Sequence, residues 1–200
     1  MLTGADKTEA ADGRRLRSAD SRRRIIQALL ELVQQGHHNP GAEDVAQRAG
    51  VGLRTVFRLF KDMESLTAEM MVPQRQEFID CFNARYVSPR GPGRIMELYA
   101  RLAKLFERRM PIRRAGIIRQ YDSPALRAGM RELDEAIIAF IQRNAPDALT
   151  ADAGRMEMLS LLTSYDAWMR LRDAQGLTFE QAYALLAASI GQLIGQEFNG

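Results

Sequence analysis

The feature that most constrains this chain is a short glycine-containing turn, residues 50–52, between two short amphipathic segments. Residues 42–49 place their apolar side chains on one side of a helical segment, and Val56 and Phe60 do the same in the segment that follows. Two short helices joined by so short a turn must cross steeply, with small residues at the contact. We therefore expect a helical corner, with Ala46 and Gly50 where the two backbones approach.

A longer amphipathic helix precedes this corner. Its apolar residues recur at three- and four-residue steps from Ser21 to Gly36, the spacing of one helical face. Ser21 or Asp20 is expected to cap it, and Asn39 to cap the next helix, with a proline at the first helical position. Residues 1–20 show no such period, so we expect a flexible basic arm there.

The rest of the chain reads as helical, with no alternating strand pattern and no repeat. Proline and glycine clusters divide it into expected helices over residues 64–86, 92–109, 111–120, 124–144, 152–174 and 178–196. The predicted fold class is all-α. A three-helix, helix-turn-helix domain would cover residues 21–66, and a C-terminal helical bundle would cover residues 67–200.

Composition excludes several other classes of protein. Cys81 is the only cysteine of the 200 residues, so there is no disulfide framework or cysteine-based metal site. No nucleophile elbow, phosphate-binding loop or zinc-protease motif is present, which argues against an enzyme and against a cofactor. Residues 1–24 are polar, and the longest apolar stretch, 182–195, is too short to span a bilayer. We expect a cytoplasmic protein that uses no metal and no membrane.

A helix-turn-helix leaves the outer face of its second helix free to enter the major groove of DNA. Arg54 and Thr55 lie at the N-terminal end of that helix, where side chains meet base edges, and arginine is the commonest reader of guanine. Arg58, one turn later, can reach a base or a phosphate. The alternative is an ordinary helical corner whose charges are solvated.

Residues 24–66 resemble the DNA-binding domain of the tetracycline-repressor (TetR) family of bacterial transcriptional regulators. The resemblance is carried by Ile25, Ala28, Leu32, Gly36, Val45, Ala46, Ala49, Gly50, Val51, Thr55, Phe57, Phe60 and Leu66. Residues 164–186 are similar, more loosely, to the last two helices of many members. The resemblance implies an all-α homodimer that binds a double-stranded DNA operator and a small-molecule effector.

Transferred position by position, the resemblance gives a set of expected DNA-contacting residues. They are Arg22, Arg23, Glu43, Leu53, Arg54, Thr55, Phe57, Arg58 and Lys61. Two positions depart from the family. Phe57 stands where a tyrosine usually donates to a phosphate, and Met63 stands where a lysine is usual.

The C-terminal region offers candidates for an effector pocket and for a dimer interface. Large or soft side chains that could line a pocket are Tyr99, Phe106, Met110, Tyr121, Met130, Tyr165 and Trp168, although such residues more often form a core. Residues expected at the dimer interface are Trp168, Ala187, Ile190, Gly191, Ile194 and Gly195. The last helix is apolar on two sides, which fits a helix packed between its own domain and a second subunit. The central helix of a monomer is the alternative.

Two functions follow from these patterns. The first is a sequence-specific transcriptional regulator, a repressor released from DNA by a small, largely hydrophobic effector. The second is a divergent helical sensor or interaction protein that has lost operator binding, which the departures at Phe57 and Met63 favour. An all-helical enzyme has no residues to support it.

Overall fold

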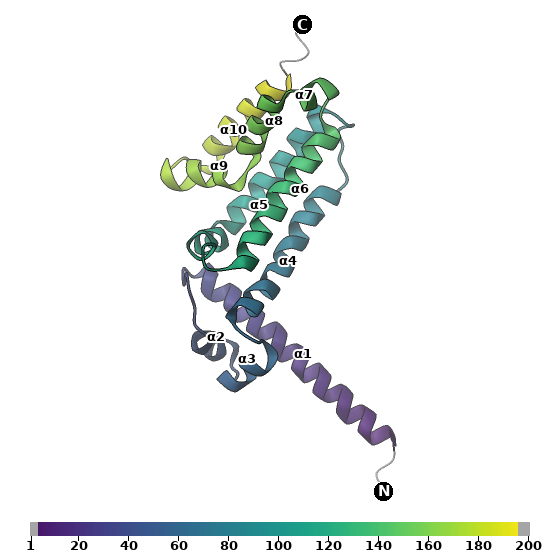
Figure 1. Ribbon diagram of the computed structural model, residues 1–200, viewed down its shortest axis with the longest axis vertical. Helices are drawn as coiled ribbons and strands as arrows, with labels where there is room; N and C mark the ends of the chain where they lie inside the picture. Colours follow the sequence, from purple (N-terminus) through teal and green to yellow (C-terminus); the bar gives the residue numbers. More distant parts are fainter. Residues whose placement is uncertain (1–3, 196–200) are drawn as a thin grey trace. The chain divides into compact units, whose positions relative to one another are not determined.

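A computed structural model describes residues 4–195, without the side chains of residues 4–12, 14, 118 and 148. Within that range the chain is built from helices and contains no strand, which confirms the all-α prediction (Figure 1). The elements are α1 (Gly4–Gln34), α2 (Ala42–Ala49), α3 (Leu53–Leu59), α4 (Met63–Asn83), α5 (Pro92–Arg119), α6 (Pro124–Asn144), α7 (Asp147–Ala151), α8 (Ala153–Thr163), α9 (Tyr165–Met169), the π-helix η1 (Arg170–Ala174) and α10 (Phe179–Gly195). None of the described helices combines the length and apolar character needed to cross a membrane.

By its contacts the chain divides into two compact units. The first unit comprises the described residues up to Pro73 together with Pro111–Arg127. The second comprises Gln74–Met110 and the described residues from Ala128 onward. Residues 111–127, expected in the C-terminal region, thus pack with the helix-turn-helix.

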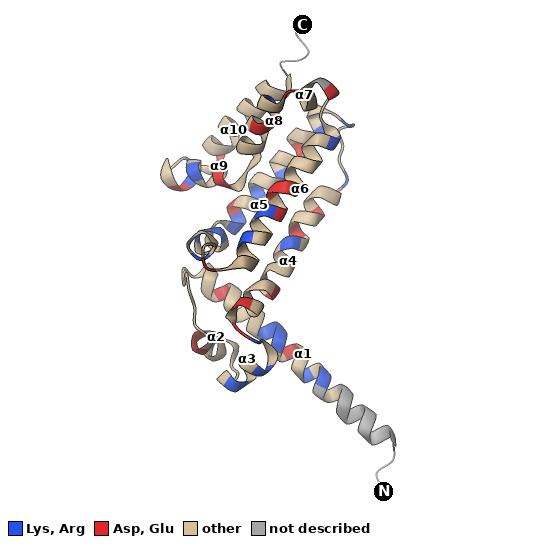
Figure 2. Ribbon diagram, viewed as in Figure 1, with Lys and Arg blue, Asp and Glu red and all other residues tan. Residues whose placement is uncertain are grey.

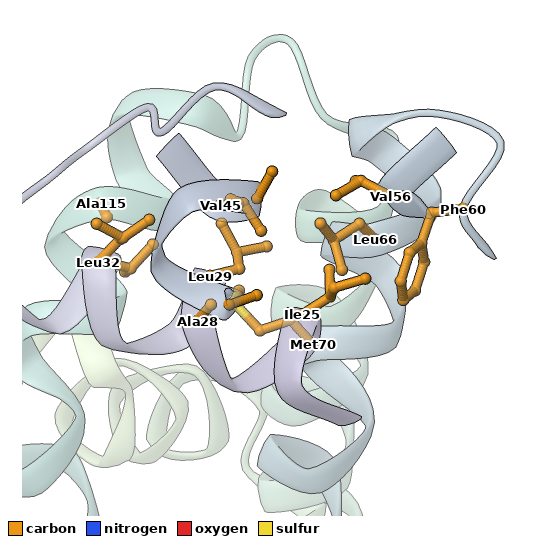
Figure 3. Close-up of a cluster of buried hydrophobic side chains, with 13 residues drawn as sticks. Ile25, Ala28, Leu29, Leu32, Val45, Val56, Phe60, Leu66, Met70 and Ala115 are labelled. Atoms are coloured by element: carbon orange, nitrogen blue, oxygen red, sulfur yellow. The ribbon is translucent and has the colours of Figure 1, made fainter. Parts of the chain in front are cut away.

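The core of the first unit joins α1, α2, α3 and the start of α4 (Figure 3). Ile25 and Leu29 of α1, Val45 of α2, Val56 of α3 and Leu66 of α4 are each at most 1% exposed. Side chains of this size contribute about 1.5–3 kcal/mol each when they are fully buried. The short helices α2 and α3 are therefore held in place by shared burial rather than by their own helix propensity.

The expected flexible arm is wrong for residues 4–20, because α1 already begins at Gly4. Asp20 lies inside this helix and pairs with Arg23 at 2.5 Å and with Arg24 at 3.9 Å, so it is no cap. Residues 4–20 include four alanines and three arginines, which favour helix even where no apolar face exists. Residues 1–3 of the expected arm lie outside the described residues.

Three other helix boundaries differ from expectation. α5 continues through Pro111, where a break was expected, and the predicted helix over 152–174 is divided at Ser164. The Ser164 hydroxyl accepts a hydrogen bond from the Ala167 N–H at 3.1 Å and so caps a new helix. At α2 the N-cap is Gly41 rather than Asn39, and its N–H donates to Asp44 at 2.8 Å.

The second unit has an aromatic core contributed mainly by α5, α9 and α10. Tyr99, Phe106 and Trp168 are at most 1% exposed. The Phe106 and Tyr165 rings lie 4.5 Å apart between centroids, and the Trp168 and Phe179 rings lie 5.4 Å apart, edge to face. These contacts fix α9 and α10 against α5.

Candidate nucleic-acid interface

The turn between α2 and α3 depends on the backbone conformation of Gly50. Its φ of 63° is left-handed, and hydrogen bonds from the Gly50 N–H to Gln47 (3.2 Å) and from the Val51 N–H to Ala46 (3.0 Å) close α2. A Cβ on Gly50 would meet no other atom within 4 Å. The expectation of close packing at Gly50 is therefore wrong, because glycine is needed there for its conformation. Ala46, which is 4% exposed, does lie at the helix contact.

α3 has one buried side and one exposed side. Val56 on its inner side is 1% exposed and Phe60, just after it, is 2% exposed, as the spacing predicted. Arg54 and Arg58 are exposed and have no ion-pair partner among the described residues. Leu53, at 37%, and Phe57, at 51%, are exposed as well. Thr55 is half-buried.

Arg22, expected to contact DNA, instead ties the helices of the first unit together. Its Nε donates to Glu69 at 2.7 Å, a terminal nitrogen donates to the Leu59 carbonyl at 2.9 Å, and the other terminal nitrogen pairs with Glu69. The guanidinium also lies 4.6 Å from the centre of the Phe60 ring. These contacts hold Arg22 against the end of α3, and Glu69 neutralises its charge.

Basic residues also occur on α1 near the turn (Figure 2). Arg24 donates to the Gly50 carbonyl at 3.4 Å, and the exposed Arg23 lies beside it. Together with Gln27, Glu31 and Arg48 they line an open groove of about 340 Å³. Sequence reasoning did not single out Arg48, which pairs with Glu31 at 2.8 Å.

The remaining expected DNA contacts, Glu43 and Lys61, are exposed on α2 and between α3 and α4. Asp62 follows Lys61 and caps α4 by accepting the Ser65 N–H at 2.8 Å, and this backbone hydrogen bond lowers the pKa of the Asp62 carboxyl. Met63 is half-buried and packs against the core of the first unit. It therefore stabilises the start of α4 where the family resemblance places a phosphate contact.

Most of the expected pocket residues of the second unit are buried. Phe106, Met110, Tyr165 and Trp168, like Tyr99, are at most 5% exposed, and Met130 is half-buried. Tyr121 is wrong as a pocket residue, because it belongs to the first unit and is 76% exposed. The Tyr99 hydroxyl is buried and has no hydrogen-bond partner among the residues that the structure describes, and burial raises the pKa of this phenol.

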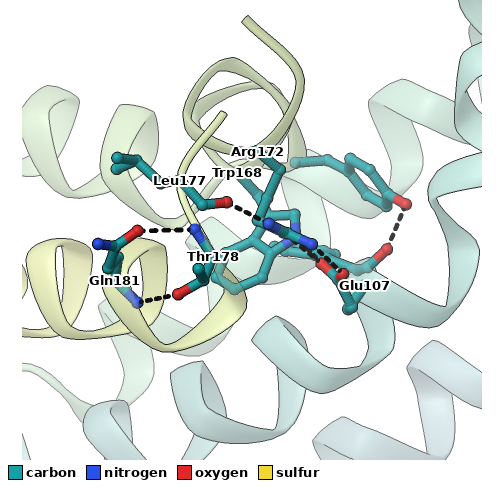
Figure 4. A network of polar contacts seen from close by, with 8 residues as sticks. Glu107, Trp168, Arg172, Leu177, Thr178 and Gln181 are labelled. Carbon is teal, nitrogen blue, oxygen red and sulfur yellow. Dashed lines mark hydrogen bonds and ion pairs between the residues drawn. The ribbon is translucent and has the colours of Figure 1, made fainter. Parts of the chain in front are cut away.

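A polar network lies beside this core (Figure 4). Glu107 accepts from Trp168 Nε1 at 3.1 Å and from Arg172 at 2.9 and 2.6 Å. Arg172 donates in addition to the Leu177 carbonyl, in the link between η1 and α10. The network fixes η1 and the start of α10 to α5, and the hydrogen bond with Glu107 raises the pKa of Arg172.

Three of the six expected interface residues are buried inside the chain. Trp168, Ile190 and Ile194 are at most 2% exposed, so they have no surface for direct contact with a second subunit. Of the remaining three, Ala187 and Gly191 are half-buried and Gly195 is exposed. Sequence reasoning missed the large apolar side chains that are exposed on α8 and α10, namely Met158 at 46%, Leu161 at 55% and Leu185 at 49%.

No group of three or more histidine, cysteine, aspartate or glutamate side chains suited to hold a metal ion occurs among the described residues. A scan against models of protein families found no match, and a search of curated proteins found no relative.

Solved structures do resemble the chain. A proposed transcriptional regulator from Streptomyces coelicolor A3(2) is 20% identical, with a TM-score of 0.63 over 87% of this chain and 98% of its own. A proposed TetR-family transcriptional regulator from Mesorhizobium loti is also 20% identical, with a TM-score of 0.61 over 90% and 98%. A TetR transcriptional regulator from Rhodococcus sp. RHA1 is 17% identical, with a TM-score of 0.56 over 88% and 96%. The chain therefore has the all-helical fold of TetR-type transcriptional regulators.

Proposed function

We propose that this protein is a DNA-binding transcriptional regulator that inserts α3 into the major groove of its operator. The observation that carries the proposal is the exposed side of α3, where Arg54 and Arg58 have no ion-pair partner among the described residues. Unpaired arginines on a helix held by a buried inner side can reach base edges and phosphates. Lys61 adds positive charge nearby, and Arg23 and Arg24 together have one acidic partner among the described residues, Asp20.

The test is selection of bound duplexes from a random pool, followed by affinity measurements over a range of salt concentrations. A regulator of this kind enriches one sequence, and the logarithm of its binding constant falls linearly with the logarithm of salt concentration. Arg54→Ala is expected to relax preference at one base position by about 1–3 kcal/mol. Equal loss on all sequences would make Arg54 a phosphate contact, and failure to enrich any sequence would refute the proposal.

The finer parts of the function are a homodimer and an effector-controlled release from DNA, in a cytoplasmic protein. Exposed Leu161 and Leu185 on α8 and α10, which pack together, support a second copy as the partner of this face. The buried aromatic side chains of the second unit support a largely hydrophobic effector, since an apolar site favours apolar ligands. Release by that effector makes the protein a repressor.

A second function has its own support. Phe57 has no hydroxyl to donate to a phosphate, Met63 packs into the core, and Arg22 is neutralised by Glu69. A chain short of three phosphate contacts would be a helical sensor or interaction protein without an operator. The selection from the random pool decides between the two, because this second protein would show only weak binding that is independent of sequence.

A further inference from the structure

The exposed side of α3 carries two apolar side chains one turn apart. Phe57 is 51% exposed and makes no ring contact with the other described residues, and Leu53 is 37% exposed. A single exposed apolar side chain is ordinary on a protein surface, so exposure alone does not indicate a function. The position of these two side chains is what distinguishes them.

Phe57 and Leu53 alternate with exposed arginines on one short helix. Along α3 the order is Leu53, Arg54, then Phe57, Arg58, so each apolar residue is followed by a cation. Folding does not require this arrangement, because Val56 and Phe60 already supply the buried contacts. If the arginines face DNA, the two apolar side chains face the same groove.

Within the major groove, one base offers an apolar group at its edge, which is the C5-methyl of thymine. A phenyl ring has no hydrogen-bond donor, so it gains nothing from a phosphate oxygen but does gain from removing a methyl group from water. We propose that Phe57 reads a thymine methyl group in the operator, with Leu53 as a second methyl contact. The proposal rests on the proposed function, since it requires α3 to lie in the groove.

Helix geometry adds a condition on spacing. Four residues of α-helix rise about 6 Å, and successive bases on one strand are about 3.4 Å apart. With the helix axis running along the groove, Phe57 and Leu53 would contact base pairs about two steps apart. The expected half-site therefore has thymine methyl groups at that separation.

The experiment replaces thymine by uracil, one position at a time, in the duplex selected from the random pool. Uracil lacks only the methyl group, so pairing and the other groups of the major groove stay the same. Loss of one buried methyl is expected to weaken binding about fourfold, or about fifteenfold when both half-sites are changed. The expected result is one sensitive thymine in each half-site for Phe57.

The same substitutions are then measured with Phe57→Ala. If Phe57 contacts the methyl, the variant binds the thymine duplex more weakly and no longer distinguishes thymine from uracil at that position. Phe57→Leu, which keeps an apolar side chain, should retain part of the distinction. Val87→Ala, which truncates an apolar side chain that is 95% exposed in the second unit, is the matched control and should leave binding unchanged.

Two results would overturn the inference. One is a selected duplex in which no uracil substitution weakens binding, and the other is a sensitive thymine whose effect is the same in Phe57→Ala. In both cases a specific sequence has been selected, so the proposed function stands and only the role of Phe57 fails. A pool that yields no specific sequence refutes both proposals together.

Discussion

Arg22 can act as a structural tie or as a DNA contact, and the two roles predict opposite effects of Glu69→Ala on DNA affinity. Arg22→Ala removes a hydrogen bond to a carbonyl, worth about 1 kcal/mol. It also removes a partly exposed ion pair, worth about 0.5–1 kcal/mol, and a ring contact of about 0.5 kcal/mol. Taken together, these three losses are expected to lower the free energy of unfolding of Arg22→Ala by about 2 kcal/mol. Glu69→Ala should lose about 1 kcal/mol, because it removes the ion pair alone.

The informative measurement is DNA affinity. If Arg22 positions the end of α3, both Arg22→Ala and Glu69→Ala weaken binding to the selected duplex, and the salt slope stays that of the wild type. If Arg22 contacts a phosphate, Glu69→Ala tightens binding by removing a nearby negative charge, and Arg22→Ala lowers the slope by about 0.9. The second pair of results would refute the structural role of Arg22.

The matched control is Glu132→Ala, which breaks a surface ion pair with Arg75 in the second unit, where both side chains are at least 50% exposed. It should change the free energy of unfolding by less than about 1 kcal/mol and leave DNA affinity unchanged. Urea unfolding of purified variants and fluorescence anisotropy with a labelled duplex supply both quantities.

Three other predictions concern the turn, the dimer and acid sensitivity. Gly50→Ala should cost about 1–2 kcal/mol in urea unfolding, since it forces a left-handed residue to carry a Cβ. Gly52→Ala should cost far less, because φ of Gly52 is −71° and an added Cβ would meet no other atom within 4 Å. Equal costs for the two variants would contradict this explanation. Gly191→Glu has room for its Cβ within one chain, so light scattering should show a folded monomer; a mutant that stays dimeric would place the interface elsewhere. Because hydrogen bonding lowers the pKa of Asp62 in the folded state, its contribution to stability is present above about pH 4 and is lost as pH falls through the lowered value. Asp62→Asn should remove that part of the acid sensitivity in a pH series of thermal unfolding, and an unchanged profile would exclude this role.

The three-helix core could be predicted from sequence because its signal is local. Each helix carries apolar residues at helical spacing, and the members Ile25, Val45, Val56 and Leu66 are all buried, as their spacing predicted. The N-terminal half of α1 could not be predicted in this way, because a charged helix that buries nothing has no apolar period. The continuation of α5 through Pro111 was not predicted either, because proline weakens a helix but does not have to end it.

The exposed residues of the candidate interface could be predicted where the buried positions of the same helix were already assigned. Arg54 and Arg58 remain outside once the buried positions of α3 are assigned. The role of Arg22 was not predictable, because its partner Glu69 lies 47 residues away and only the fold brings the two together. The same holds for Tyr121, whose aromatic side chain suggested a pocket, although the fold leaves it in solvent.

The contact between Glu107 and Arg172 has a consequence for how this sequence can vary. Both side chains are largely buried, with 30% and 22% of their surfaces exposed, and Trp168 donates to the same carboxylate. Replacing either charged residue leaves the other partly buried and without its counter-charge, which costs more than the intact pair contributes. Positions 107 and 172 should therefore change together in evolution or stay as they are, and in related sequences a neutral residue at one should accompany a neutral residue at the other.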